Sequence, residues 1–340
     1  MGLGLRLAQG RSLPRSFLIA PPLAVSAIGL GFASQTLWRP PVSAHQRDVL
    51  DALMAPPPAS ATRPAAGLAA DTTASATQAA TPTGALQARR LPASSAGGGQ
   101  ANASNLNLEI RVALLKLSPY PRVGGDGGWR VVSREGQVLR QGGAGEASQA
   151  SDLLAERPEV WIEATGSAPL RADGRPYAGR LRLLRAADGI QVVNHLPLES
   201  YVSSVVGGEM PSSWRIEALR AQAVAARSYA MAHMARPADA HWHLGDTTRW
   251  QNYEGLNTVS DPTLTATRTT AGVILSYQGG IVESLYAATQ QIVEEAHGHL
   301  GASMSQTGAQ QLAEQGLPFQ EILAHYYQGA SLARLQIGAS

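Results

Sequence analysis

The chain has 340 residues, with 27 lysines and arginines against 25 aspartates and glutamates, and its formal net charge is +2. This near balance, with arginines spread along the chain and not gathered into a basic stripe, argues against a nucleic-acid-binding protein. The absence of cysteine excludes disulfides and thiolate metal sites.

Residues 1–44 have the pattern of an export signal or membrane anchor. Arg6, Arg11 and Arg15 precede a mostly apolar run over 16–37, which is the order of charge and hydrophobicity typical of a secretory signal. Small residues at 42–44 offer a cleavage site, but the apolar run is also long enough to span a bilayer. Cleavage therefore stays open, and in both cases we expect the folded part to be extracytoplasmic, in the periplasm or cell envelope.

Residues 45–104 are dominated by Ala, Pro, Ser, Thr, Gln and Gly, with almost no aliphatic periodicity. Such a segment buries too little apolar surface to offset the entropy lost on ordering. We predict a disordered linker over 45–104, followed by one globular domain over 105–340, which is a normal size for a single domain.

The first part of this domain has the pattern of β-strands. Residues 108–114 alternate between apolar and other side chains, and short β-rich runs follow at 129–132, 160–163, 179–183 and 190–193. Clusters of Gly, Pro and Asp separate these runs and indicate turns.

Helical spacing begins after Pro197. The apolar residues from Leu198 to Val206 follow one helix face, and a second, alanine-rich helix is predicted from about 216 to 234. Gly207 and Gly208 stand between the two patterns and Pro211 follows, so we predict that the helix is interrupted and that Glu209 lies on a bend.

The C-terminal part contains a predicted hairpin and two short helices. The β-rich runs 272–277 and 281–286 flank a Gly-Gly pair, and helical patterns follow at 306–315 and 319–327. Strands first and helices after predict a single mixed α+β domain, with an N-terminal strand-rich part and helices around the bend at Glu209.

Three ordered patches of the sequence resemble the SpoIID/LytB family, which includes a sporulation lytic transglycosylase that cuts peptidoglycan glycan strands. They run from Leu198 through Glu209-Met210-Pro211 to Tyr229, from Asp246 to Gly255, and from Met304-Ser305-Gln306 to Tyr327. The resemblance covers roughly residues 108–335, and three patches in the same order make it specific.

The resemblance implies that Glu209 is the general acid and base of a lytic transglycosylase. Most glycosidases use two carboxylates, but one is sufficient here because the C6 hydroxyl of muramic acid attacks within the same sugar and leaves a 1,6-anhydro end. Burial of the bend would raise the pKa of Glu209, as this role requires.

The resemblance also implies a set of substrate-binding residues, for most of which a plain structural role is the alternative. For the two arginines of the second helix that alternative is a surface ion pair; for the aspartate and the tyrosines it is turn formation or packing. The set consists of Arg220, Gln222, Arg227, Asp246, Gln251, Tyr253, Tyr286, Ser305 and Gln306.

No cofactor and no metal site is predicted. The pairs His241 and His243, and His297 and His299, have spacings that zinc ligands can have. We interpret both pairs as solvated loop histidines, and no nucleotide, flavin or haem motif is present.

The sequence departs from the family pattern after Thr289, where a Gly-Gly pair and many tens of residues are missing. Two hypotheses therefore stay open. One is an exported lytic transglycosylase acting on peptide-stripped glycan strands. The other is a non-catalytic peptidoglycan-binding modifier that recruits or stimulates a cell-wall amidase. A structural wall-associated domain is a third, weaker alternative, and membrane contact is expected only through the N-terminal segment.

Overall fold

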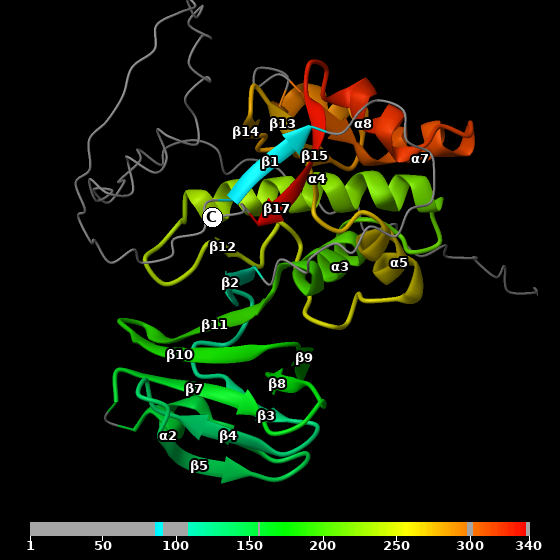
Figure 1. Ribbon diagram of the computed structural model, residues 1–340. Helices are drawn as coiled ribbons and strands as arrows, with labels where there is room; N and C mark the ends of the chain where they lie inside the picture. Colours follow the sequence, from blue (N-terminus) through cyan, green and yellow to red (C-terminus); the bar gives the residue numbers. More distant parts are fainter. Residues whose placement is uncertain (1–85, 91–107, 156, 298–301, 338–340) are drawn as a thin grey trace, which may run out of the picture. The chain divides into compact units, whose positions relative to one another are not determined.

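Figure 1 shows the computed structural model, which describes residues 86–90, 108–155, 157–297 and 302–337. The chain divides into two units, Met1–Ser43 and Ala44–Ser340, and every described residue belongs to the second. The predicted signal or anchor therefore lies outside the described residues, as does most of the predicted linker. Within that linker, strand β1 (Leu86–Arg90) pairs antiparallel with β17 (Ser331–Ile337).

The strand-rich part is built on a seven-stranded sheet in the order β12-β2-β11-β10-β7-β4-β5. Its neighbours pair antiparallel, except that β12 runs parallel to β2. The strands are β2 (Glu109–Ala113), β4 (Trp129–Val132), β5 (Val138–Gly142), β7 (Glu159–Ala164), β10 (Arg180–Ala186), β11 (Gly189–Pro197) and β12 (Leu244–Gly245). The five strands predicted from alternation and β-rich runs correspond to β2, β4, β7, β10 and β11 and are confirmed.

A second, four-stranded sheet has the order β6-β3-β8-β9 and was not predicted. Its strands are β3 (Arg122–Gly125), β6 (Ala147–Gln149), β8 (Leu170–Ala172) and β9 (Arg175–Tyr177), and the short helix α2 (Ala150–Leu154) follows β6 directly. These runs are too short, and too rich in Gly, Pro and polar residues, to show a period-two pattern.

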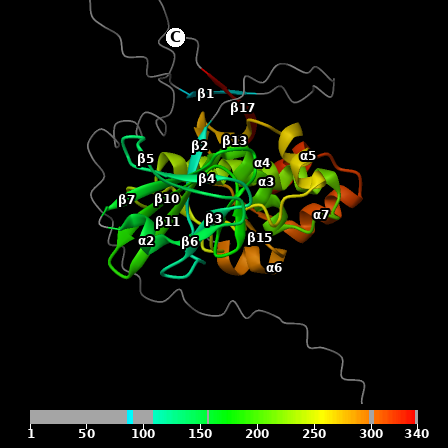
Figure 2. The ribbon, with the colours of Figure 1, turned by 90° about the horizontal axis from the view of Figure 1, so that it is seen from below.

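The helical part gathers around α4 (Ile216–Ala235), which contacts the other main helices (Figure 1). These are α3 (Leu198–Glu209), α5 (Asp261–Thr269), α7 (Gln306–Glu314) and α8 (Phe319–Tyr326). Most alanines of α4 are fully buried, and their small side chains allow neighbouring elements to approach closely. Figure 2 shows these helices grouped beside the strands. The predicted α+β class, with strands first, is confirmed.

The predicted hairpin forms, but its second strand is interrupted. Strand β13 (Val273–Tyr277) pairs with the two-residue β14 (Gly280–Ile281) through a turn at Gln278 and Gly279, where φ is 50° and 86°. Ser284 then donates to the Ala225 carbonyl over 2.7 Å. This bond holds the chain against α4, and residues Leu285–Ala287 form a separate strand, β15.

Strand β15 pairs parallel with β16 (Ser303–Ser305). The described part of the connection between them contains α6 (Gln290–Ile292) and the π-helical segment η1 (Val293–His297). This is the region in which the sequence departs from the family pattern. None of the helices in the described part of the chain combines the length and the apolar character needed to cross a membrane.

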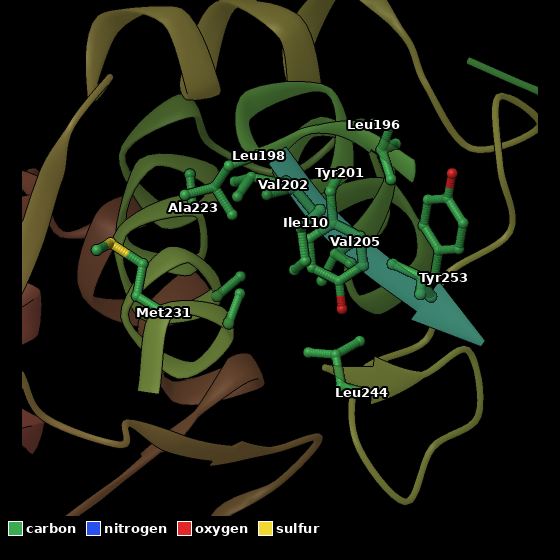
Figure 3. Packing of buried hydrophobic residues seen from close by; sticks show 14 of the residues in the cluster. Ile110, Leu196, Leu198, Tyr201, Val202, Val205, Ala223, Met231, Leu244 and Tyr253 are labelled. Atoms are coloured by element: carbon green, nitrogen blue, oxygen red, sulfur yellow. The ribbon is translucent and has the colours of Figure 1, made fainter. Parts of the chain in front are cut away.

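One apolar cluster joins the strand-rich part to the helices (Figure 3). It takes in Ile110 from β2, Tyr201 and Val205 from α3, and Met231 from α4, each 5% exposed or less. Because the two parts share this cluster, the end of α3 and the loops of the strand-rich part have fixed positions relative to each other.

Helix α3 runs through Gly207 and Gly208 and ends at Glu209, so the prediction that the glycine pair interrupts it is wrong. Instead, the two glycines allow backbone carbonyl groups from another segment to approach α3 closely. A Cβ at 207 would lie 1.9 Å from the Thr258 carbonyl oxygen, and one at 208 would lie 2.3 Å from that of Asn252. The chain bends only after Glu209.

We expect Gly208→Ala to destabilise the protein, although alanine in a helix is ordinarily better than glycine by about 1 kcal/mol. The added methyl group overlaps the Asn252 carbonyl, and overpacking of this kind costs roughly 1–3 kcal/mol. Urea unfolding measures the difference. Gly166→Ala is the matched control, because its Cβ meets nothing within 4 Å. Equal stability of the two variants would contradict the close-approach explanation.

Candidate functional site

Two donors from distant parts of the chain hold the carboxylate of Glu209. The backbone N–H of Asn252 donates to Oε1 over 2.7 Å, and Nε2 of Gln306 donates to Oε2 over 3.3 Å. The Glu209 side chain is half-buried, at the C-terminal end of α3. The fold thus brings Glu209 and Gln306, two predicted site residues 97 positions apart, into direct contact.

Burial raises the pKa of Glu209 above its ordinary value. The Asn252 N–H, the Gln306 amide and the positive charge of Lys116 act in the opposite direction without cancelling the effect of burial. A carboxyl group in this state keeps its proton closer to neutral pH than a solvated glutamate does. It is therefore suited to donate a proton and then to take one back.

Gln251, Tyr201 and Tyr286 form a hydrogen-bonded chain beside Glu209. Gln251 Nε2 donates to the Ala226 carbonyl over 3.1 Å, and this fixes the amide because a carbonyl can only accept. Gln251 Oε1 accordingly accepts from the Tyr201 hydroxyl over 2.8 Å, and Nε2 also donates to the Tyr286 hydroxyl over 2.8 Å.

The Tyr286 hydroxyl does not donate its proton within this set of hydrogen bonds, because its oxygen accepts from Gln251. After burial, the charge of Glu209 is the next largest cause that raises the pKa of Tyr286, and it also raises the pKa of Tyr201. The Glu209 carboxyl group therefore lies close enough to the hydroxyls of Tyr201 and Tyr286 to change their pKa values. Tyr286 is half-buried, whereas Gln251 and Tyr201 are fully buried, so of the three side chains only Tyr286 is accessible from solvent.

Asp246 and Tyr253 lie in the predicted loop but are buried, at 0% and 2% exposure. Asp246 Oδ1 accepts from the Leu115 backbone N–H over 2.9 Å, and the Tyr253 hydroxyl donates to Asn194 Oδ1 over 2.6 Å. Both contacts tie the loop to the strand-rich part. The structural alternatives, turn formation and packing, describe these two residues better than direct sugar contact does.

The two predicted arginines of α4 lie outside the contacts of Glu209. Arg227 is fully buried, and its Nε and Nη2 donate to the two carboxylate oxygens of Glu199 over 2.8 and 2.6 Å. Its Nη1 donates to the Val273 carbonyl over 3.0 Å. Arg220 forms an ion pair with Glu217, one turn away on the same helix. The prediction that Arg227 contacts substrate is not supported, because no part of its side chain reaches solvent.

Gln222 and Ser305 have different surroundings. Gln222 is fully buried in α4, and in the described part of the chain neither polar atom of its side chain has a hydrogen-bond partner. Ser305 is the N-cap of α7, where its Oγ accepts from the Gly308 N–H over 3.1 Å. Its position fixes the start of the helix on which Gln306 reaches Glu209.

The histidines of the two pairs have different surroundings. His243 is buried and faces Arg111 with both ring nitrogens at 3.0 Å, so the prediction of a solvated loop histidine is wrong for this residue. His241 is exposed and His297 is half-buried, while His299 lies outside the described residues. Over residues 86–90, 108–155, 157–297 and 302–337, no group of three or more His, Cys, Asp or Glu is placed to hold a metal ion.

The burial of His243 predicts that the stability of the protein depends on pH. Burial, and next the charge of Arg111, lower the pKa of its imidazole to about 3, whereas an unfolded histidine titrates near about 6.5. At a pH between these two pKa values, the imidazole is therefore protonated in the unfolded state and neutral in the folded state. The stability that His243 contributes is complete above the unfolded pKa and decreases, by about 1.4 kcal/mol per pH unit, as the pH falls toward 3.

We expect His243→Asn to remove most of this dependence, because its amide oxygen can still accept from the Arg111 N–H but does not titrate. Urea unfolding at pH 6.5 and pH 4.5 measures it, and the wild type should lose about 2 kcal/mol more than the variant. Equal losses in the two proteins would mean that His243 is protonated in the folded state.

Sequence reasoning missed Asn252 and Lys116. Asn252 stands inside the second family-like patch, but it acts on Glu209 through its backbone N–H, which its residue type does not reveal. Lys116 lies 2.7 Å from Asn252 Oδ1. It is the only lysine of the chain, and that is the one signal that could have singled it out.

Residues 186–277 match the model of the SpoIID family, described as stage II sporulation protein. The chain is 36% identical over 117 residues to an uncharacterized protein of Brachyspira hyodysenteriae (34% of this chain and 32% of that protein). It is 33% identical over 102 residues to the amidase enhancer of Bacillus subtilis (30% and 14%). It is 32% identical over 118 residues to stage II sporulation protein D of the same species (29% and 33%). The chain thus spans between 14% and 33% of the length of these relatives.

Proposed function

We propose that this chain, whose residues 186–277 belong to the SpoIID/LytB family, acts on the cell wall as an exported lytic transglycosylase that cleaves glycan strands of peptidoglycan. The relatives named stage II sporulation protein D and amidase enhancer support a cell-wall function. The observation that carries the cleavage step is Glu209, a half-buried carboxyl group whose pKa burial raises and which two donors hold.

The reaction needs one carboxyl group used twice. Protonated Glu209 gives its proton to the glycosidic oxygen as the bond from that oxygen to the anomeric carbon of muramic acid breaks. The C6 hydroxyl of the same sugar then forms a new bond to the anomeric carbon, and its proton passes to the Glu209 carboxylate. The product ends in a 1,6-anhydro ring, no water is consumed, and Glu209 is protonated again.

The neighbours of Glu209 have matching roles. The Asn252 N–H and the Gln306 amide stabilise the carboxylate that exists between the two proton transfers. The Tyr286 hydroxyl keeps a proton that it can donate beside the Glu209 carboxyl group, and we propose that it donates this proton in a hydrogen bond to a sugar oxygen. Tyr286 is therefore the predicted binding residue that we retain for direct substrate contact, whereas the buried Gln306 acts through Glu209.

The alternative is a non-catalytic peptidoglycan-binding modifier that recruits or stimulates a cell-wall amidase. The similarity to the Bacillus subtilis amidase enhancer favours it. The short connection between β15 and β16, through α6 and η1, favours it as well. This connection stands where the family pattern has a much longer segment.

The test is mass spectrometry of peptide-free glycan strands after incubation with the full chain. Fragments with 1,6-anhydromuramic ends support the transglycosylase. Fragments with reducing ends would mean that water attacks and would refute the intramolecular step. Intact strands that sediment with the protein support the modifier, which a purified cell-wall amidase then tests by its rate with and without the chain.

A further inference from the structure

A charged cluster lies next to Glu209 and has no part in the proton transfers above. Lys116 belongs to the loop after β2, and its side chain is 23% exposed. Its Nζ lies 2.7 Å from Asn252 Oδ1 and 2.7 Å from Glu254 Oε1. The other carboxylate oxygen of Glu254 accepts from Arg175 over 3.2 Å. A loop of the strand-rich part thus reaches the loop that carries the donor of Glu209.

Asn252 is held at three atoms, and Lys116 holds one of them. Its Nδ2 donates to the Gly208 carbonyl over 2.8 Å, which fixes the amide because a carbonyl can only accept. Its Oδ1 accordingly faces Lys116, and its backbone N–H donates to Glu209 Oε1 over 2.7 Å. A change at Lys116 therefore reaches the carboxyl group through one residue.

We propose that Lys116 is a positioning residue for Glu209: it holds Asn252 in the orientation that bonds the carboxyl group, and it supplies the positive charge that acts on that group. The inference rests on the proposed function only in so far as Glu209 is the acid. The arrangement of charges is independent of turnover.

The other titratable groups that face Glu209 are phenols. They are Tyr201 on α3, Tyr229 on α4 and Tyr286 on β15, and burial raises the pKa of each. They stay neutral over any working pH, and Gln306 on α7 does not titrate. Among the residues that the structure describes, Lys116 is the charged group that acts on Glu209, and it lowers the pKa of that carboxyl.

Two variants should move the ionisation of Glu209 in opposite directions. Lys116→Met removes the positive charge, so Glu209 should keep its proton to higher pH, with a shift of about one pH unit. Glu254→Gln removes the negative charge that offsets Lys116, so Glu209 should lose its proton at lower pH. Lys116→Arg keeps the charge and should stay close to the wild type.

The measurement is a ¹³C NMR titration of glutamate carboxyl groups in the full chain, with the Glu209 signal assigned by its loss in Glu209→Gln. The alkaline limb of the pH–rate profile should move with it. An unchanged Glu209 titration in Lys116→Met, with only a lower unfolding midpoint, would reduce Lys116 to a structural tie and overturn the inference.

Two further outcomes are also decisive. If Lys116→Met does not fold, the downward shift in Glu254→Gln decides instead, and an unchanged titration there overturns the inference. If the wild type cleaves no glycan, the proposed function fails, yet the titration still reports on Lys116. The two failures are therefore distinguishable.

Discussion

Glu209→Gln is expected to lower the rate of glycan cleavage by about 10²–10⁴-fold, the usual contribution of a positioned proton-transfer group. Glutamine preserves the shape of the side chain, and its Oε1 can still accept from the Asn252 N–H. Its amide cannot accept from Gln306, whose own amide must rotate to present oxygen. The measurement is the time course of 1,6-anhydro ends by mass spectrometry.

A measurement of stability distinguishes a Glu209→Gln protein that has lost the catalytic step from one that has lost its fold. Because burial raises the pKa of Glu209, the folded state keeps this proton to higher pH than the unfolded state. The stability gained from it is complete below the unfolded pKa and is lost as the pH rises through the folded pKa. At neutral pH, glutamine removes a partly buried charge, so the variant should be at least as stable as the wild type.

Glu314→Gln is the matched control, because Glu314 is exposed at the end of α7. It should cleave at the wild-type rate. A Glu209→Gln protein that also cleaves at that rate would show that Glu209 is not the acid, and the carboxyl would then have to be sought elsewhere. If neither the wild type nor the variant cleaves but both bind glycan, the modifier hypothesis replaces the transglycosylase hypothesis.

Arg227→Met is expected to lower the free energy of unfolding by about 1.5–3 kcal/mol, the usual contribution of hydrogen bonds to a charged group, because the guanidinium is buried whereas its partner Glu199 is 38% exposed. The change leaves Glu199 without its partner and the Val273 carbonyl without the guanidinium donor. These contacts join α3, α4 and β13 at one point, so the loss should affect the whole helical part. Urea unfolding at neutral pH measures it.

Arg220→Met on the same helix provides the comparison. Arg220 pairs with Glu217 where both side chains are about a quarter exposed, and such pairs contribute roughly 0–1 kcal/mol. If Arg227→Met instead folds with wild-type stability but no longer binds glycan, the original prediction of a substrate contact returns and the structural explanation is wrong.

Local patterns in the sequence were sufficient for the long elements. The strands β2, β4 and β7 and the helices α3, α4, α7 and α8 were predicted near their observed bounds, because side-chain patterns report buried faces directly. Strands β10 and β11 were also predicted, but they end at Ala186 and Pro197, beyond the predicted runs. The short strands β3, β8 and β9 could not be predicted, because runs of three or four residues that contain Gly, Pro or polar side chains carry no readable period.

The glycine pair shows where local reasoning fails. Gly207 and Gly208 have the composition of a helix break, yet α3 continues through them because the carbonyl groups of Thr258 and Asn252 approach too closely for any Cβ. That reason lies some fifty residues away in the chain, and no property of the two glycines reveals it.

The order of residues alone settled that the domain is α+β, that α3 precedes α4, and that Glu209 stands where they meet. Only the fold decided which side chains surround that carboxyl group. It placed Lys116, Asn252 and Gln306 around the carboxyl group and Arg227 apart from it. Packing of the shared core sets proximity between residues 43 or more positions apart, whereas sequence patterns report only neighbours along the chain.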